Sequence, residues 1–372
     1  MSDSPEPILR KLNRELNRLS LFAVAGFLIG FAGLAVAGGW CAAGVWLAQA
    51  GAGLWLIRQT ARRRLALNRL NPRTPLYRNL GWGNRLTLLR GALIAATGGC
   101  LFSDPTAPAN PWLPALCYTL AALLDRYDGY AARRSGRVSL LGAELDLHFD
   151  ALGLLIAPLL AVQWQRLPTG YLLLSLAFYL YRWLLQARVR RGLPTFPLPD
   201  NPLRRTLAGF QMGFVALTLW PVLEPAFSRQ VSTAFMLPVL FGFVADWLVA
   251  NGRCTARTYT QIGELADRTA LPGLRIGLIL ALTLAGGFER TEAAGLSVAL
   301  AWSASILLAV GCAGRLGALA ILLLFGGGWL SVAQPALGLA ILFAASWLLL
   351  LGTGRYSLSR WGEAWLQRYV GA

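Results

Sequence analysis

The stretch "DRYDGYAARRSGRVSLLGAELDLHFD", residues 125–150, places four aspartates between two long apolar runs. A lone aspartate at the centre of a membrane helix costs about 2.5–3.5 kcal/mol on insertion scales, so something must compensate for these four. Asp125 and Asp128 are three residues apart, and Asp146 and Asp150 are four apart. Each pair therefore lies on one face of a helix. The glycines between the pairs predict a turn, so the stretch is expected to form a helical hairpin.

A hairpin that gathers four carboxylates is suited to binding divalent cations. Oxygen ligands without a nearby cluster of His or Cys favour Mg²⁺, Mn²⁺ or Ca²⁺ over zinc. Bound cations also remove the repulsion between the carboxylates, and a pair of them creates a site for phosphate chemistry. We therefore expect Asp125, Asp128, Asp146 and Asp150 to be metal ligands, with two Mg²⁺ or Mn²⁺ ions as the cofactor.

The composition around this stretch is that of a membrane protein. The 372 residues are 56% hydrophobic and only 14% charged, whereas soluble domains carry about 25% charged residues. The net charge of +17 comes from 34 Lys and Arg against 17 Asp and Glu. Because the arginines lie in short loops between apolar runs, they indicate topology and contact with anionic lipid, and nucleic acid is not an expected partner.

Twelve apolar runs predict twelve membrane spans. They lie at about 20–37, 40–57, 86–102, 112–130, 141–163, 169–187, 206–223, 233–250, 273–288, 294–311, 316–333 and 336–352. With both termini cytoplasmic, only Arg166, Arg229 and Arg290 fall in outward loops, as the positive-inside rule requires. The aspartates then face the cytoplasm. The Arg-rich, almost Lys-free composition and the lack of a targeting segment favour a bacterial plasma (inner) membrane.

Three regions follow from this pattern. Residues 1–77 are predicted to form an amphipathic helix (8–19), a transmembrane hairpin and a basic cytoplasmic loop. Residues 78–251 contain the four aspartates and end at a polar stretch with helix breakers, residues 251–273. Residues 252–372 form a four-helix membrane extension that ends in an interfacial tail, "RYSLSRWGEAWLQRYV", residues 355–370.

The aspartates also belong to a longer pattern. It reads Asp-x-x-Asp-Gly-x-x-Ala-Arg, eight residues, Gly, three residues, Asp, three residues, Asp. This pattern resembles the complete signature of the CDP-alcohol phosphotransferases, and "GNRLTLLRG" (83–91) is similar to the segment that opens the family's first core helix. The resemblance covers residues 78–251 and implies that they form the catalytic core, a bundle of six helices with extra transmembrane helices at both ends.

The resemblance implies transfer of a substituted phosphoryl group, in phospholipid biosynthesis, from a CDP-linked donor to an alcohol acceptor with release of CMP. Asp150 would also be the base that takes the acceptor's proton. The CDP-binding residues implied, the last two less directly, are Gly129, Ala132, Arg133, Gly142, Asn84 and Thr87. The family's homodimers would have to accommodate the extra helices, so the oligomeric state stays open.

Several alternatives remain at this point. CDP-diacylglycerol is the expected donor, but "LGAELDLHFD" (141–150) also resembles the branch that uses CDP-aminoalcohols with a lipid acceptor. A twelve-helix secondary transporter is the competing class, although the aspartates lie at helix ends and no repeat is visible. Arg182 and Arg188 are candidates for binding the acceptor or a phosphate.

Three other polar residues have a structural interpretation. His148 lies two residues from Asp146 and from Asp150, so it points about 200° away and is expected to pack rather than to bind a ligand. Glu144 is likewise off the aspartate face, and Asp246 is expected to pair with a nearby arginine.

Overall fold

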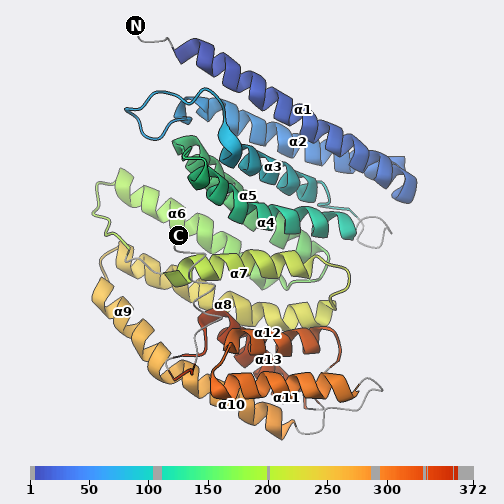
Figure 1. Cartoon of the computed structure of the whole chain (residues 1–372), viewed down its shortest axis with the longest axis vertical. Helices are drawn as coiled ribbons and strands as arrows, with labels where there is room; N and C mark the ends of the chain where they lie inside the picture. The colour runs from blue at the N-terminus through green and yellow to red at the C-terminus, as the bar shows by residue number, and fades with distance from the viewer. Residues whose placement is uncertain are drawn as a thin grey trace. The chain divides into compact units, whose positions relative to one another are not determined.

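A computed structural model of the chain describes residues 5–103, 111–198, 202–285, 294–329, 332, 334–354 and 356–358. All regular elements of the described residues are helices, which confirms the all-α fold (Figure 1). The predicted tail at 355–370 falls mostly outside the described residues. Packing divides the chain into two compact units, and the division passes through one helix, α7.

The first unit comprises residues 1–165 and 212–222. Its helices are α1 (Pro5–Gly38), α2 (Trp40–Arg64), the short η1 (Leu65–Leu67), α3 (Gly81–Gly98), α4 (Trp112–Arg134), α5 (Leu140–Gln163) and the second part of α7 (Pro202–Thr218). Within it α3 packs against α2, α4 and α5, and α1 packs along α2. The helix α3 is therefore the centre of this unit.

The second unit comprises residues 166–211 and 223–372. Its longer helices are α6 (Leu172–Arg190), α8 (Pro225–Ala250), α9 (Ala256–Leu265), α10 (Leu271–Leu284), α11 (Ala294–Val310), α12 (Gly314–Gly326) and α13 (Pro335–Leu351). Two one-turn segments, η2 (Thr169–Tyr171) and η3 (Ala266–Ala270), complete it. Helix α13 packs against α8, α10 and α12, and the indole N–H of Trp347 donates to the carbonyl of Ala234 at 3.0 Å.

Four helices of the described residues are long and apolar enough to cross a membrane, so the chain is an integral membrane protein. They are Glu6–Gly38, Trp40–Leu67, Leu140–Gln163 and Pro225–Ala250. Shorter apolar helices lie at Thr206–Thr218, Ala299–Val310, Gly314–Gly326 and Pro335–Leu351. The count of twelve spans, and the division at residues 77 and 251, remain predictions.

The start of the chain differs from the expected separate amphipathic helix. Residues 5–38 form one continuous helix, so the amphipathic segment is the first part of the first span. No proline or glycine interrupts residues 8–25, and the hydroxyl of Ser20 donates to the carbonyl of Leu16 at 2.9 Å across the expected boundary. Leu12 and Leu16 are fully buried, which shows that this segment is packed against the protein.

Close helix contacts in the first unit depend on two glycines of α3. A Cβ on Gly83 would lie 2.7 Å from the Cβ of Ala132 on α4, and one on Gly91 would lie 2.9 Å from the ring of Phe149 on α5. Since real Cβ atoms do not approach that closely, only glycine lets α4 and α5 pack this tightly on α3. These contacts place the polar faces of the three helices together.

Candidate active site

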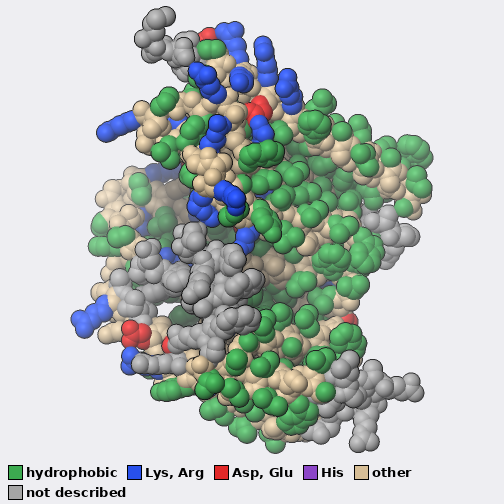
Figure 2. Space-filling view, viewed as in Figure 1, with side chains coloured by type: hydrophobic (Ala, Val, Ile, Leu, Met, Phe, Trp, Pro, Cys, Tyr) green, Lys and Arg blue, Asp and Glu red, His purple; other side chains and the backbone are tan. Residues whose placement is uncertain are grey.

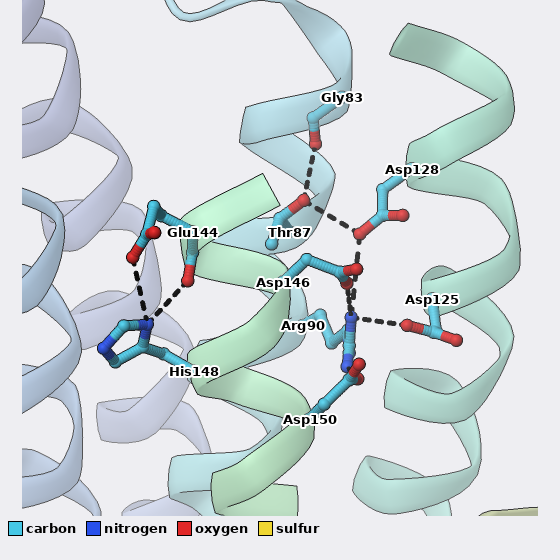
Figure 3. A network of polar contacts seen from close by, with 9 residues as sticks. All are labelled: Gly83, Thr87, Arg90, Asp125, Asp128, Glu144, Asp146, His148 and Asp150. Carbon is cyan, nitrogen blue, oxygen red and sulfur yellow. Dashed lines mark hydrogen bonds and ion pairs between the residues drawn. The ribbon is translucent and has the colours of Figure 1, made fainter. Parts of the chain in front are cut away.

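The four aspartates meet around an arginine that sequence analysis did not single out. Asp125 and Asp128 come from α4, Asp146 and Asp150 from α5, and Arg90 from α3 (Figure 3). We call the four acidic residues the aspartate cluster. All five side chains belong to the first unit, so the hairpin predicted from the sequence does bring its two pairs of carboxylates together.

Arg90 bonds to the cluster through both ends of its guanidinium. Its Nη1 lies 2.5 Å from Oδ1 of Asp125, 2.7 Å from Oδ1 of Asp146 and 3.9 Å from Oδ2 of Asp128. Its Nη2 donates to Oδ1 of Asp150. The Arg90 side chain is fully buried, so this arginine is the cation that compensates for part of the carboxylate charge within the protein.

Burial divides the aspartate cluster into an open and a closed side. The side chains of Asp146 and Asp150 are 47% and 41% exposed, whereas that of Asp128 is only 8% exposed. Asp128 also accepts a hydrogen bond of 2.8 Å from the hydroxyl of Thr87, whose Oγ1 lies 3.1 Å from the carbonyl oxygen of Gly83. A ligand can therefore reach the α5 pair directly, while Asp128 forms the inner wall.

The geometry fits a divalent cation. Asp125, Asp146 and Asp150 each offer a carboxylate oxygen, and these three oxygens lie within 4.8 Å of one another. Oxygens bound to one Mg²⁺ at about 2.1 Å are at most about 4.2 Å apart, so a small movement of the side chains would bring these three oxygens within reach of one ion, with water in the other coordination positions. The oxygen-only donor set suits Mg²⁺ or Mn²⁺.

A buried polar network fixes the start of α5. Ser139 is the N-cap of this helix, and its Oγ accepts the backbone N–H of Gly142 at 3.0 Å. The amide Nδ2 of Asn84 on α3, which has two hydrogens to donate, lies within hydrogen-bond distance of three acceptors: Ser139 Oγ at 3.1 Å, Asn68 Oδ1 at 3.0 Å and the carbonyl oxygen of Leu80 at 2.9 Å. The network therefore ties the first turn of α5 to α3, which sets the register of Asp146 and Asp150.

The expected CDP-binding residues have distinct surroundings. Ala132 and Gly142 face α3, because a Cβ on Gly142 would lie 2.6 Å from Oδ1 of Asn84. The Arg133 guanidinium folds back over Gly129, where an added Cβ would lie 3.2 Å from Nη1. Their roles in binding CDP stay predictions. Arg182 and Arg188 lie in the second unit, where they stack on Phe178 and Trp247.

His148, Glu144 and Asp246 were predicted to have structural roles, and the structure shows their surroundings. His148 and Glu144 point away from the aspartate cluster (Figure 3), and both contact Arg64, at 3.0 Å and 3.6 Å. In the second unit Asp246 pairs with Arg204 at 2.9 Å. The predicted direction of His148 and Glu144 and the pairing of Asp246 with an arginine are confirmed, whereas the absence of a ligand at His148 and Glu144 stays a prediction.

The sequence did contain a signal for Arg90. Asn84, Thr87 and Arg90 recur every three residues in "GNRLTLLRG", so the helix that they form has one polar face. An arginine within an apolar helix must find a partner, and the uncompensated aspartates were the available ones.

The comparisons with known proteins agree with this geometry. Residues 82–245 match the family model of the CDP-alcohol phosphatidyltransferases, and the matched range contains Arg90 and the whole aspartate cluster. No match was found among curated proteins or among solved structures. Over residues 82–245 the chain therefore contains a region of the CDP-alcohol phosphatidyltransferase type, the type of a family of enzymes that transfer substituted phosphate groups.

Proposed function

We propose that the chain transfers a phosphatidyl group from CDP-diacylglycerol to the hydroxyl of a polar alcohol, with release of CMP and with Mg²⁺ or Mn²⁺ as cofactor. The observation that carries this proposal is the convergence of three carboxylate oxygens within 4.8 Å inside the region that matches the family. An all-oxygen cluster beside a buried arginine is suited to a pyrophosphate, which carries charge that both a metal and a guanidinium can neutralise.

The proposed reaction exchanges one phosphoester bond for another. The acceptor oxygen forms a bond to the phosphorus of the phosphatidyl group, and the bond between that phosphorus and the oxygen of CMP breaks. Asp150 takes the proton of the acceptor hydroxyl, since it lies one turn further along α5 than Asp146 and its half-exposed carboxylate is open to a ligand. A divalent cation in the cluster would neutralise the pyrophosphate and stabilise the CMP leaving group.

Arg90 and Asp128 have supporting roles in this proposal. The Arg90 guanidinium has donors at both Nη atoms, so it can exchange a carboxylate for a phosphate oxygen without losing its hydrogen bonds. Asp128, held by Thr87, would orient the ion from the closed side. Of the predicted CDP-binding residues, Arg133 would contact the pyrophosphate of the donor, and Gly129, Ala132 and Gly142 would leave room for the cytidine and its phosphates.

The test is release of CMP by the purified full-length protein in detergent. CDP-diacylglycerol is supplied with a panel of alcohols, with Mg²⁺, Mn²⁺ or EDTA. We expect release that requires one acceptor and a metal, and that falls by a factor of about 10²–10⁴ in Asp150→Asn. Glu144→Gln, on the same helix but facing away from the cluster, is the matched control and should retain most activity.

The panel also separates the alternatives. CDP-choline-type donors with diacylglycerol form the second arm, and turnover there alone would reverse the assignment of donor and acceptor. Absence of turnover with every CDP compound, in protein whose melting temperature responds to Mg²⁺, would exclude the transferase reaction.

A further inference from the structure

A pocket of about 310 Å³ lies between the start of α1 and the end of α2, in a part of the chain that the family model does not match. Its lining includes three arginines and two leucines, Arg10, Arg62, Arg63, Leu9 and Leu65, together with Asn13 and Ala66. Figure 2 shows Lys and Arg side chains gathered at this end of the first unit, with hydrophobic side chains along the further part of α1. The pocket thus combines cationic and apolar walls.

Acidic side chains balance the charge of this pocket only in part. Arg62 and Arg63 are exposed and form no ion pair within the described part of the chain. Arg10 pairs with Glu6 at 2.9 Å, and both of these side chains are more than 70% exposed, so the contact is weak. Three guanidiniums around one pocket repel one another unless an anion lies between them.

The pocket lies at the level expected for lipid headgroups. It is formed by the ends of two helices that are long and apolar enough to cross a membrane. Further along α1 the exposed side chains are apolar, with Leu21, Phe22 and Ile29 all at least 70% exposed. The arginines therefore stand just outside the apolar part of the span, where phosphate groups of the bilayer are found.

We propose that this pocket binds the phosphate of an anionic phospholipid. The planar guanidiniums of Arg62 and Arg63 supply paired donors for phosphate oxygens. Leu9 and Leu65 contact the apolar part of the same molecule, which a free phosphate ion lacks. The site is separate from the aspartate cluster, and the proposal does not depend on which alcohol the enzyme uses.

Lipid binding here would act on the catalytic helix through Glu15. This carboxylate accepts the backbone N–H of Leu80, the N-cap of α3, at 3.0 Å and pairs with Arg85 of α3 at 2.7 Å. A phosphate held between Arg10 of α1 and Arg62 of α2 fastens the start of α1 to its neighbour. It thereby stabilises the helix that holds α3, and with it Arg90, in place.

The experiment measures the melting temperature of the full-length protein in detergent with EDTA, as dioctanoyl-phosphatidylglycerol is added. Dioctanoyl-phosphatidylcholine and inorganic phosphate are titrated separately. We expect phosphatidylglycerol to raise the melting temperature saturably, and its half-saturating concentration to increase about tenfold or more in the Arg62→Gln/Arg63→Gln variant. Since both side chains are exposed, the variant is expected to fold.

The matched control is Arg73→Gln/Arg78→Gln, which removes the same charge from exposed positions outside the pocket. It should bind phosphatidylglycerol as the unmodified chain does. Equal weakening in both variants would show unspecific attraction to a basic surface and overturn the proposal. Stabilisation by inorganic phosphate at the same concentration would also overturn it, because the site would then bind the ion rather than a lipid. No donor or metal is present, so the outcome is independent of the transfer reaction.

Discussion

Arg90 is the residue on which the electrostatics of the site depend. Four carboxylates approach one buried guanidinium, which leaves a negative excess before any ion binds. Removing one partner from a buried ionic group typically costs about 3–5 kcal/mol, because the remaining charges lose their compensation.

We therefore expect Arg90→Gln to lower the melting temperature strongly in EDTA, and Mg²⁺ to restore more stability to this variant than to the unmodified chain. Arg90→Lys should be intermediate, since one ammonium cannot bond to Asp146 and Asp150 as two Nη atoms do. Thermal denaturation with and without Mg²⁺ is the measurement, with the exposed Arg134→Gln as control. An unchanged melting temperature of Arg90→Gln in EDTA would contradict this account.

Two glycines of the signature should respond differently to an added methyl group. In Gly142→Ala the new Cβ would meet Asn84 at 2.6 Å within a buried network, so we expect both activity and melting temperature to fall. In Gly129→Ala the new Cβ would meet only the guanidinium of Arg133, at 3.2 Å from Nη1, at the end of a flexible side chain. Activity should therefore fall with little loss of stability. Parallel assays of CMP release and thermal unfolding test this pair, and equal loss of stability in both would contradict it.

The spacing of the four aspartates was enough to predict that they lie together, but it did not predict Arg90 as the cation between them. Spacings of three and four residues place carboxylates on a helix face without knowledge of the fold. The partner of those carboxylates lies 35 residues before Asp125, and only the packing of α3 between α4 and α5 brings it near. The same packing turned Asn84, expected to line the nucleotide site, toward Ser139.

Among the elements, α1 departs most from its expected form. Its polar first part, residues 8–19, was predicted to lie on the membrane surface, and seven of these twelve residues have charged or amide side chains. The structure instead buries Leu12 and Leu16 and uses Glu15 to cap α3. A hydrophobic pattern shows that a face will be buried, but it cannot distinguish lipid from protein as the partner.

Glu15→Gln should consequently destabilise the first unit by about 1–2 kcal/mol, through loss of the Arg85 ion pair and of a charged cap. Glu6→Gln is the control on the same helix, and its exposed pair with Arg10 should be worth about 0.2–0.5 kcal/mol. Thermal unfolding of both single variants, and of Glu15→Gln combined with Arg85→Gln, measures the difference. Additive effects in the double variant would mean that the two residues do not interact.

For the whole molecule, the composition was enough to predict a membrane protein. It did not predict where the chain divides into two compact units. The compact units separate at residue 165, inside the region that matches the family, because packing depends on contacts between distant segments. Twelve spans, cytoplasmic termini and a homodimer remain predictions.

Orientation can be tested with one native and one introduced cysteine. If the termini are cytoplasmic, the connection between α1 and α2 faces outward, and the exposed Cys41 follows it directly. A membrane-impermeant maleimide should label Cys41 in intact cells, and Cys41→Ala should lose the label. Arg73→Cys in that background should react only after permeabilisation. The reverse pattern would invert the topology.

The glycine contacts of α3 have a consequence for how acceptor preference can change during evolution. Gly83 packs against Ala132 and Gly91 against Phe149. The three helices that carry the aspartates and Arg90 are therefore already in close contact, and their spacing is fixed. A larger acceptor cannot be accommodated by spreading these three helices. Variation in substrate must then arise from side chains on other walls, so the reactive geometry can be inherited unchanged by enzymes that make different products.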